Sequence, residues 1–222
     1  MFEKFAKIHS LCTSIGGKRM QNASIYTSYQ ELRQGDKKDK KQNMNTTEYL
    51  DKFYDSVLGF LTKNSLEELP QGFCEEEIKN YETKKAIEFP KAYRLFLSLM
   101  AKSNLRIFDS QDFTISGLND AEEVSQELLE KDKHKLGPNQ FVFSQWQGYN
   151  FYYLDLNSEN PDVELYIQAG CAFEGSPAEI YKYGRFTDWL CKKIEISLNL
   201  RKRLEGLEIE ELLDDLEKIR VA

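Results

Sequence analysis

The sequence has few of the residues and motifs on which enzymes and metalloproteins depend. Its two histidines are His9 and His134, and His134 lies in a charged run with no second histidine or cysteine at ligand spacing, so we expect no metal site. Neither G-x-x-x-x-G-K-[ST] nor G-x-G-x-x-G occurs. No Ser/His/Asp set can be built without one of the two histidines, and adjacent carboxylates such as Glu122 and Glu123 are normally only solvated. We therefore predict no catalytic residue, no cofactor and a non-enzymatic protein.

Long apolar runs are also missing. No stretch approaches the ~20 consecutive apolar residues of a membrane helix, and residues 1–20 lack the apolar segment of a secretory signal. The four cysteines, Cys12, Cys74, Cys171 and Cys191, lie far apart and form no C-x-x-C motif. This pattern favours unpaired thiols in a reducing compartment, although spacing alone leaves disulfides open. We predict a cytoplasmic protein without membrane contact.

Charge is distributed unevenly along the 222 residues, whose net charge is −7. Residues 1–45 hold nine Lys/Arg against four Asp/Glu, whereas residues 46–222 hold 21 against 33. The acidic part should repel nucleic acid and membrane phosphates and attract basic protein surfaces. Solubility alone is the competing explanation for this acidity.

Residues 1–45 differ from the remainder in composition. Residues 35–43 contain no apolar side chain, and such a stretch cannot bury enough surface to offset its ordering entropy. It is either a flexible arm or not part of the natural protein, with Met44 as the true start. We divide the chain into this leader (1–45), a folded domain (46–200) and a C-terminal amphipathic helix (201–222).

Helical periodicity begins at Thr46 and continues through Leu61. A second, mostly polar helix is predicted over 75–86. A third opens at Pro90, which suits the first helical position, and its apolar positions include Tyr93 and Phe96. A fourth is predicted from Asn119 through residue 130.

Strand signals dominate the centre of the chain. Short strands are predicted at 105–108 and 113–116, and the segments 141–146 and 149–155 flank Gln147-Gly148, a hairpin turn. Residues 163–168 alternate, with Val163, Leu165 and Ile167 predicted inward and Glu164, Tyr166 and Gln168 outward. An edge strand at 180–183 precedes a packing helix from Phe186 through Leu198. N-terminal helices, a mixed or antiparallel sheet with a central hairpin, and a C-terminal packing helix make an α+β fold.

Two features of this fold have two interpretations each. Residues 204–220 form a helix with an apolar stripe among many carboxylates, which either packs on the domain or binds a partner. Trp146, Tyr149, Tyr152 and Tyr166 either form an exposed platform for RNA or belong to the core and protein contacts. No basic groove accompanies them, which favours the second interpretation.

In this order the residues resemble the SUKH superfamily, the Smi/Knr-like domain of bacterial immunity proteins and fungal cell-wall regulators. The likeness covers about residues 70–200 and rests on three segments: 76–97, with Phe89-Pro90-Lys-Ala-Tyr93 and Phe96-Leu97; 141–155, with the hairpin; and Arg185-Phe186-Thr-Asp-Trp189-Leu190. Two places depart from the family pattern. Many members have Gly-Gly where this chain has Ala101-Lys-Ser-Asn104, and Arg185 stands where a Ser cap is usual, leaving Thr187 or Gly184 to begin the helix.

The resemblance implies a non-enzymatic binder that neutralises a cognate toxin, often a nuclease or deaminase, and the acidic charge adds a mechanism in which an acidic face occludes the active site of the toxin. Combined with the charge, it implies a basic toxin domain as partner and no nucleic acid. The predicted contact residues are Asp109, Asp112, Glu122 and Glu123, whereas Pro90, Tyr93, Phe96, Trp146, Phe186 and Trp189 are predicted to be structural. The alternative is a regulatory or scaffold module that binds a cellular enzyme, as the fungal relatives do.

Overall fold

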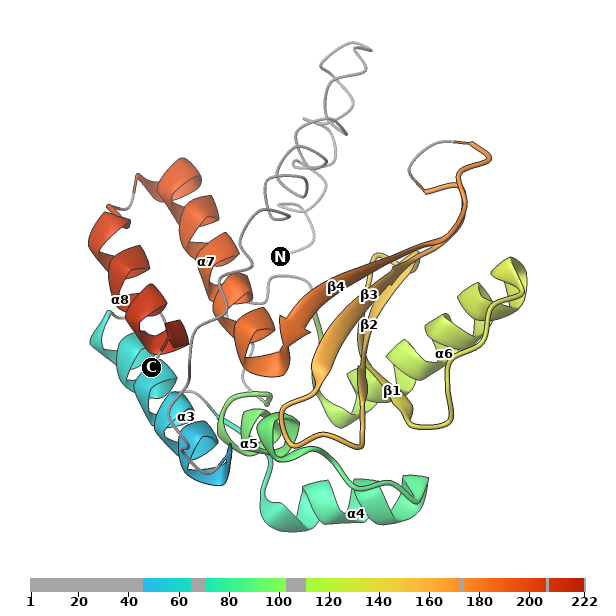
Figure 1. Ribbon diagram of the computed structural model, residues 1–222, viewed down its shortest axis with the longest axis horizontal. Helices are drawn as coiled ribbons and strands as arrows, with labels where there is room; N and C mark the ends of the chain where they lie inside the picture. The colour runs from blue at the N-terminus through green and yellow to red at the C-terminus, as the bar shows by residue number, and fades with distance from the viewer. Residues whose placement is uncertain (1–45, 65–70, 103–110, 172–173, 207, 222) are drawn as a thin grey trace, which may run out of the picture. The chain divides into compact units, whose positions relative to one another are not determined.

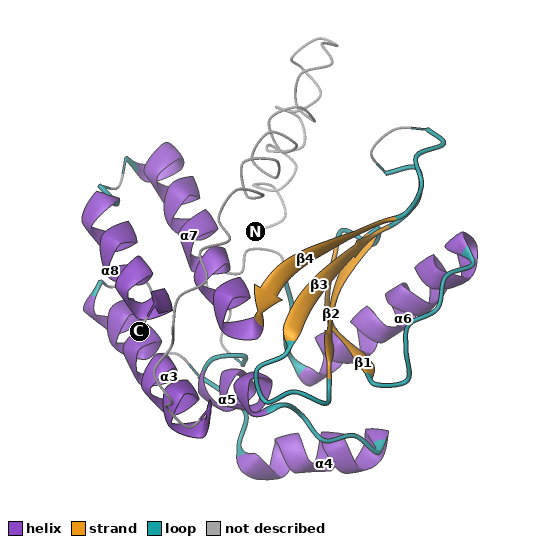
Figure 2. Ribbon diagram, viewed as in Figure 1, coloured by secondary structure: helices purple, strands orange, loops and turns teal. Residues whose placement is uncertain are grey.

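A computed structural model describes residues 46–64, 71–102, 111–171, 174–206 and 208–221. Within these ranges it contains six α-helices and one four-stranded antiparallel sheet, which confirms the α+β class (Figures 1 and 2). The elements in chain order are α3 (Thr46–Lys63), α4 (Glu75–Lys85), α5 (Lys91–Leu99), α6 (Ile115–Asp132), β1 (Gln140–Trp146), β2 (Asn150–Asp155), β3 (Asp162–Ile167), β4 (Glu179–Arg185), α7 (Phe186–Glu205) and α8 (Glu210–Val221).

The sheet is a meander in which each strand pairs with the next along the chain, in the order β1-β2-β3-β4. The predicted central hairpin is confirmed. Three residues, Gln147, Gly148 and Tyr149, connect the paired residues Trp146 and Asn150. Gln147 and Gly148 have φ values of 57° and 74°, and positive φ angles are typical of tight hairpin connections. The edge strand predicted at 180–183 is also present, as part of β4.

Helices cover both faces of this sheet (Figure 1). One face, which includes Phe143, Tyr152 and Leu165, belongs to the main core with α5 and α7. The opposite face, which includes Phe151 and Tyr166, packs with residues of α6. The prediction that Tyr166 points outward to solvent is therefore wrong, because α6 buries that second face and leaves Tyr166 0% exposed.

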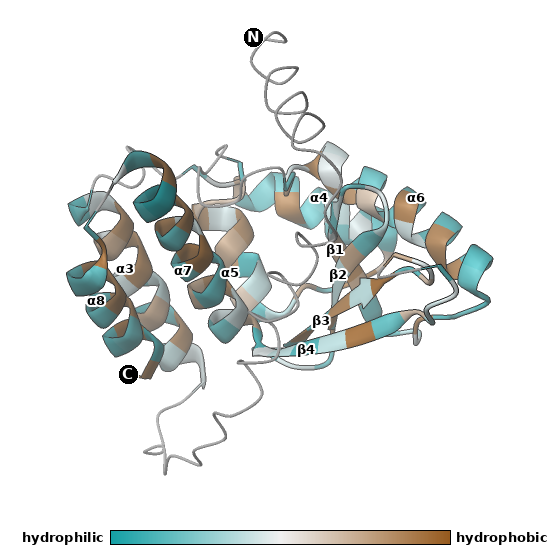
Figure 3. Cartoon of the chain, turned by 90° about the horizontal axis from the view of Figure 1, so that it is seen from above, coloured by the Kyte–Doolittle hydropathy of each residue, from teal (hydrophilic) through white to brown (hydrophobic). Residues whose placement is uncertain are grey.

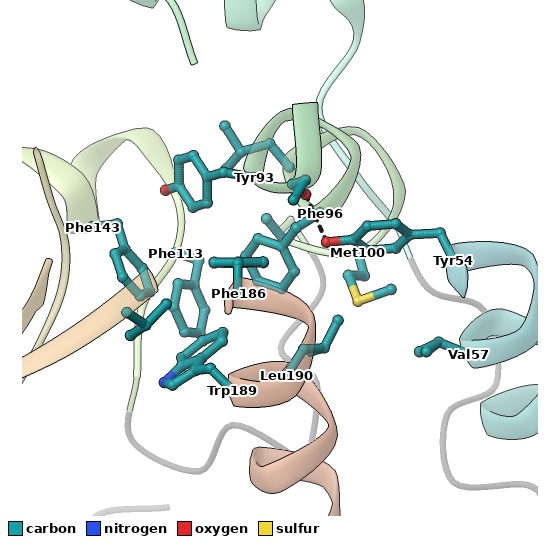
Figure 4. Packing of buried hydrophobic residues seen from close by; sticks show 14 of the residues in the cluster. Tyr54, Val57, Tyr93, Phe96, Met100, Phe113, Phe143, Phe186, Trp189 and Leu190 are labelled. Carbon is teal, nitrogen blue, oxygen red and sulfur yellow. Dashed lines mark hydrogen bonds between the residues drawn. The ribbon is translucent and has the colours of Figure 1, made fainter. Parts of the chain in front are cut away.

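Aromatic side chains fill the space between the sheet, α5 and α7 (Figure 4). Trp189 is 0% exposed, and its ring centroid lies 5.2 Å from that of Phe143 and 5.1 Å from that of Phe186. Tyr93 of α5 lies 5.5 Å from Phe186 in an edge-on arrangement. Edge-to-face rings at these separations add specific attraction to the apolar burial, so the start of α7 is fixed against both α5 and the sheet.

The helices α3 and α8 lie on the outer side of α5 and α7 (Figure 1). The Tyr54 hydroxyl of α3 donates to the Ala92 carbonyl of α5 at 2.6 Å. Ile209 and Leu216 are buried and join the main core. The C-terminal helix thus packs on the domain; it begins at Glu210, since residue 205 still belongs to α7.

Two predicted boundaries around α6 are wrong. Residues 113–116 form no strand, because Thr114 caps a helix that begins at Ile115: the Thr114 hydroxyl accepts from the Gly117 N–H at 3.2 Å. Side-chain capping of this kind satisfies an otherwise unpaired N–H and sets the helix start. The helix therefore begins four residues before the predicted Asn119. The strand predicted at 105–108 lies outside the described residues.

The beginnings of α5 and α7 also differ in detail from prediction. Pro90 is the N-cap of α5 rather than its first helical residue. Arg185 is the N-cap of α7, so neither Gly184 nor Thr187 starts the helix. The Arg185 side chain pairs instead with Asp188 at 3.0 Å, and the Thr187 N–H donates to Asn160 at 3.3 Å. A distant loop residue thus replaces the missing Ser cap.

Candidate protein-binding surface

The helix α6 separates its residues into two opposite faces. Leu118, Ala121 and Leu128 are buried on the side that faces the sheet. The other side is exposed to solvent and carries four carboxylates, Asp120, Glu123, Glu127 and Glu130. Their spacing of three, four and three residues places them along one line of a helix with 3.6 residues per turn. We call this line the acidic stripe; Figure 3 shows hydrophilic and hydrophobic bands alternating along α6.

The acidic stripe keeps its negative charge largely uncompensated. In the described part of the chain no ion pair joins any of its four carboxylates to a Lys or Arg. Lys131 lies next to the stripe at the end of α6, where a cation also suits the helix dipole. Because like charges on a solvated helix face repel, the arrangement does little for stability. It does generate a local field that attracts a basic surface.

The four predicted contact residues have different surroundings. Glu123 is exposed and belongs to the acidic stripe. Glu122 is half-buried on the flank of α6 and forms an ion pair with Lys85 of α4. Asp112 is exposed before the helix, where its carboxylate accepts from the Thr114 N–H at 2.8 Å. Asp109 lies outside the described residues.

Only one of the four predicted contact residues therefore lies in the acidic stripe. The other three members of the stripe were not predicted from the sequence. The signal was available in the sequence, since acidic residues recur at helical spacing over 120–130. Adjacent pairs such as Glu122/Glu123 are conspicuous in a sequence, but neighbours on a helix point about 100° apart and rarely share a surface.

The residues predicted to be structural lie mostly in the interior. Tyr93, Phe96, Phe186 and Trp189 are each 0% exposed, and Pro90 is buried at the start of α5. Trp146 is different: it is half-buried at the end of β1, 6.4 Å from the Tyr149 ring.

The proposed aromatic platform is not formed. Tyr152 pairs with Leu165 in the ladder and faces α7, whereas Tyr166 pairs with Phe151 and faces α6. Two of its four rings are thus buried on opposite faces of the sheet. They belong to the core, which agrees with the interpretation of these rings as core residues rather than an RNA platform.

A second acidic feature lies at the ends of β2 and β3. A hollow of about 390 Å³ is lined by Asp155, Asp162 and Glu164 together with amide and hydroxyl side chains. Glu164 accepts a hydrogen bond from the Tyr153 hydroxyl, and Lys182 of β4 lies 3.1 Å from it. The neighbouring loop is held in place by Asn160, whose amide donates to the Thr187 hydroxyl at 3.0 Å.

The described residues were also compared with the requirements of metal sites and reactive thiols. Among the described residues, no group of three or more His, Cys, Asp or Glu is placed to hold a metal ion. The described cysteines are free thiols, of which Cys191 is buried, and burial raises its pKa to about 12. Within the same residues, no helix has the length and apolar character that spanning a membrane requires.

Comparison with known proteins decides the family. The model of the SMI1 / KNR4 family (SUKH-1) matches residues 72–192, more than half of the chain and all three segments that carry the resemblance. The chain belongs to the SMI1/KNR4 family. Searches of curated proteins and of solved structures gave no significant match.

SMI1/KNR4 membership supports a non-catalytic domain with an immunity or regulatory role, which acts through contact with other proteins. The match begins just before α4 and ends within α7, so it includes the whole sheet and α6. The helices α3 and α8 lie outside the matched residues. The acidic stripe is therefore a surface of the family domain itself.

Proposed function

We propose that this SMI1/KNR4 domain is an immunity protein that binds a basic, nuclease-like toxin domain and occludes its active site. The observation that carries the proposal is the acidic stripe, an exposed row of four carboxylates without ion-pair partners in the described chain. A nuclease needs a positive groove to hold phosphates, and an acidic row can occupy the same groove. The excess of acidic residues over 46–222 adds a long-range attraction of the same sign.

Electrostatic steering has a recognisable kinetic signature. The association rate should fall steeply as salt screens the charges, while the dissociation rate changes less. A single exposed charge contributes little, so the fair test reverses two members of the stripe. We therefore choose Glu123→Lys/Glu127→Lys and compare it with Glu211→Lys/Asp214→Lys, which makes the same change of net charge on the exposed side of α8.

The partner for this test is an inactivated form of the toxin that the proposal expects to be encoded beside the gene. We expect the α6 double variant to associate with it about tenfold or more slowly at low salt, with an unchanged melting temperature. The α8 double variant should change the association rate much less. Equal slowing by both variants would show that only net charge matters and that the stripe is not the contact surface.

Cell survival gives the biological result. Co-expression of the protein with the active toxin should restore growth, and the α6 double variant should protect less than the α8 double variant. If cells die equally with and without the protein, the immunity function is wrong. The regulatory module that binds a cellular enzyme then takes its place.

A further inference from the structure

Lys193 of α7 has surroundings unlike those of the other described lysines. The residue is half-buried, and its Nζ donates to the Tyr152 hydroxyl at 2.9 Å. The same nitrogen lies 4.4 Å from the centroid of the Tyr152 ring and 5.8 Å from that of Trp189. Both rings are buried in the main core. The amine is thus held at the junction of α7 and the sheet by aromatic groups.

Among the described residues, no carboxylate forms an ion pair with this amine. In the described chain no Asp or Glu oxygen lies within 4 Å of the Lys193 nitrogen, since the acidic residues of this part of α7 are engaged elsewhere: Asp188 pairs with Arg185 and Glu195 pairs with Lys192. They lie on the opposite side of the helix, because they are five residues before and two residues after Lys193.

On this face of the sheet, β4 carries one carboxylate, Glu179, which accepts a hydrogen bond from the Tyr181 hydroxyl. β2 contributes Tyr152, and β4 contributes Tyr183, whose ring centroid lies 5.7 Å from that of Tyr152. Leu165 of β3 is apolar and buried. Burial without a counter-charge disfavours the ammonium form, and it lowers the pKa of Lys193 to about 7. Aromatic faces attract a cation only weakly compared with its lost hydration.

An amine that has lost its proton has a lone pair available for reaction. Protonated surface lysines lack it at neutral pH, and Lys192, the adjacent residue, is held in an ion pair with Glu195 at 2.9 Å. A desolvated lysine in an apolar site is a known way to obtain a nucleophile. Lys193 is half-buried rather than fully buried, so part of its side chain remains at the surface of the domain.

We propose that Lys193 is a nucleophilic modification site that accepts an acyl group from activated acyl donors such as acyl phosphates. The nitrogen lone pair attacks the carbonyl carbon and forms the C–N bond. The bond between that carbon and the phosphate oxygen breaks, and phosphate departs with the electron pair and takes up the proton from nitrogen. Nothing is oxidised or reduced. The product is a neutral amide next to Tyr152 and Trp189, so the charge at this junction no longer depends on pH.

Acetyl phosphate is the probe, applied in limiting amount to the full-length protein at pH 7.5. Acetylation of Lys193 and of Lys192 is quantified by mass spectrometry of peptides that contain both, resolved by fragmentation. Lys192 is a matched control because it has the same helix and the same sequence neighbours. We expect Lys193 to be acetylated about tenfold or more faster than Lys192, since the gain in neutral amine outweighs the lower nucleophilicity that accompanies a lower pKa.

The same reaction in denaturant shows whether the fold causes the difference. In the unfolded chain both lysines should react at similar rates, and the preference for Lys193 should vanish. A native protein in which Lys193 reacts no faster than Lys192 would overturn the proposal. So would a preference that persists in the unfolded chain, because the reactivity would then come from local sequence.

Discussion

At the scale of single residues, buried Glu82 and half-buried Lys193 differ in how their charge is compensated. Glu82 is 8% exposed, but its carboxylate accepts from the Phe89 N–H at 2.8 Å and forms an ion pair with Arg94. A buried charge that is paired and hydrogen-bonded is tolerated, and this one joins α4 to α5. Lys193 has a phenol oxygen and two aromatic rings instead of a counter-charge.

This difference predicts a pH dependence of stability for Lys193. Its pKa is lowered to about 7 in the folded protein, whereas an unfolded lysine keeps a pKa near ~10.4. Between these values the unfolded chain binds one more proton than the folded one, so the free energy of unfolding rises with pH. The melting temperature should therefore increase from pH 7 to pH 9, and this contribution is lost as the pH falls toward 7.

Lys193→Met should flatten that part of the profile, because the apolar side chain of similar length carries no proton. Lys192→Met is the control and should leave the slope unchanged. The measurement is the melting temperature of all three proteins at half-unit pH intervals. A wild-type slope that survives Lys193→Met would mean that another group produces it.

At the scale of elements, α7 contacts α5, α8 and the strands β3 and β4. Its first half carries Phe186 and Trp189 into the aromatic core, and the helix also packs against α8. Its outer side carries Ile196 and Leu200, which are 50% and 41% exposed. The two sides of the same helix should therefore differ sharply in their response to truncation.

Trp189→Ala and Phe96→Ala should each destabilise the protein by about 3–5 kcal/mol, because they leave a cavity where several rings meet. That loss approaches the whole stability of an ordinary domain. Ile196→Ala on the exposed side of α7 should change stability by no more than about 0.5 kcal/mol. Denaturant unfolding of the purified variants measures these values, and equal losses for Trp189→Ala and Ile196→Ala would contradict the packing.

Turns at this scale were predictable to different extents. The pair Gln147-Gly148 predicts a hairpin, because few residues accept two positive φ angles in succession. Gly72 gave no such signal, yet a Cβ at that position would lie 2.0 Å from backbone atoms of Ser98. Glycine is needed at this position because the turn before α4 approaches α5 closely. A local sequence pattern cannot show that approach.

At the scale of the whole molecule, charge divides the chain at about residue 45. Residues 1–45 are basic and residues 46–222 are acidic. The family match and every described element lie in the acidic part. If the acidic part binds a basic partner, the positive charge of the leader would repel that partner, so the leader should not take part in the contact.

We therefore expect that residues 1–43 are dispensable for folding. A chain that begins at Met44 keeps all of the described helices and strands, and the deleted segment is polar and basic. Its melting temperature should match that of the full chain within a few degrees. A larger drop would show that the leader contributes to the stability of the domain, and the boundary at residue 45 would be wrong.

The sequence by itself determined the types of the elements, the central hairpin and the family. These depend on local patterns: apolar residues at helical spacing, alternation along strands, and turn residues with particular φ requirements. The C-terminal packing helix was predictable for the same reason, because Phe186, Trp189 and Leu190 recur on one side of it. The acidic stripe was also encoded locally, in the spacing of carboxylates over 120–130.

Only the tertiary structure decided which residues meet across the chain. Tyr166 alternates like an outward residue, but α6 covers the second face of the sheet and buries it. Lys193 looks like any surface lysine in the sequence, and the Tyr152 and Trp189 rings that surround its amine come from β2 and from the preceding turn of α7. A periodic pattern shows which side of an element is apolar, whereas the solvation of a polar group depends on elements that arrive from elsewhere in the chain.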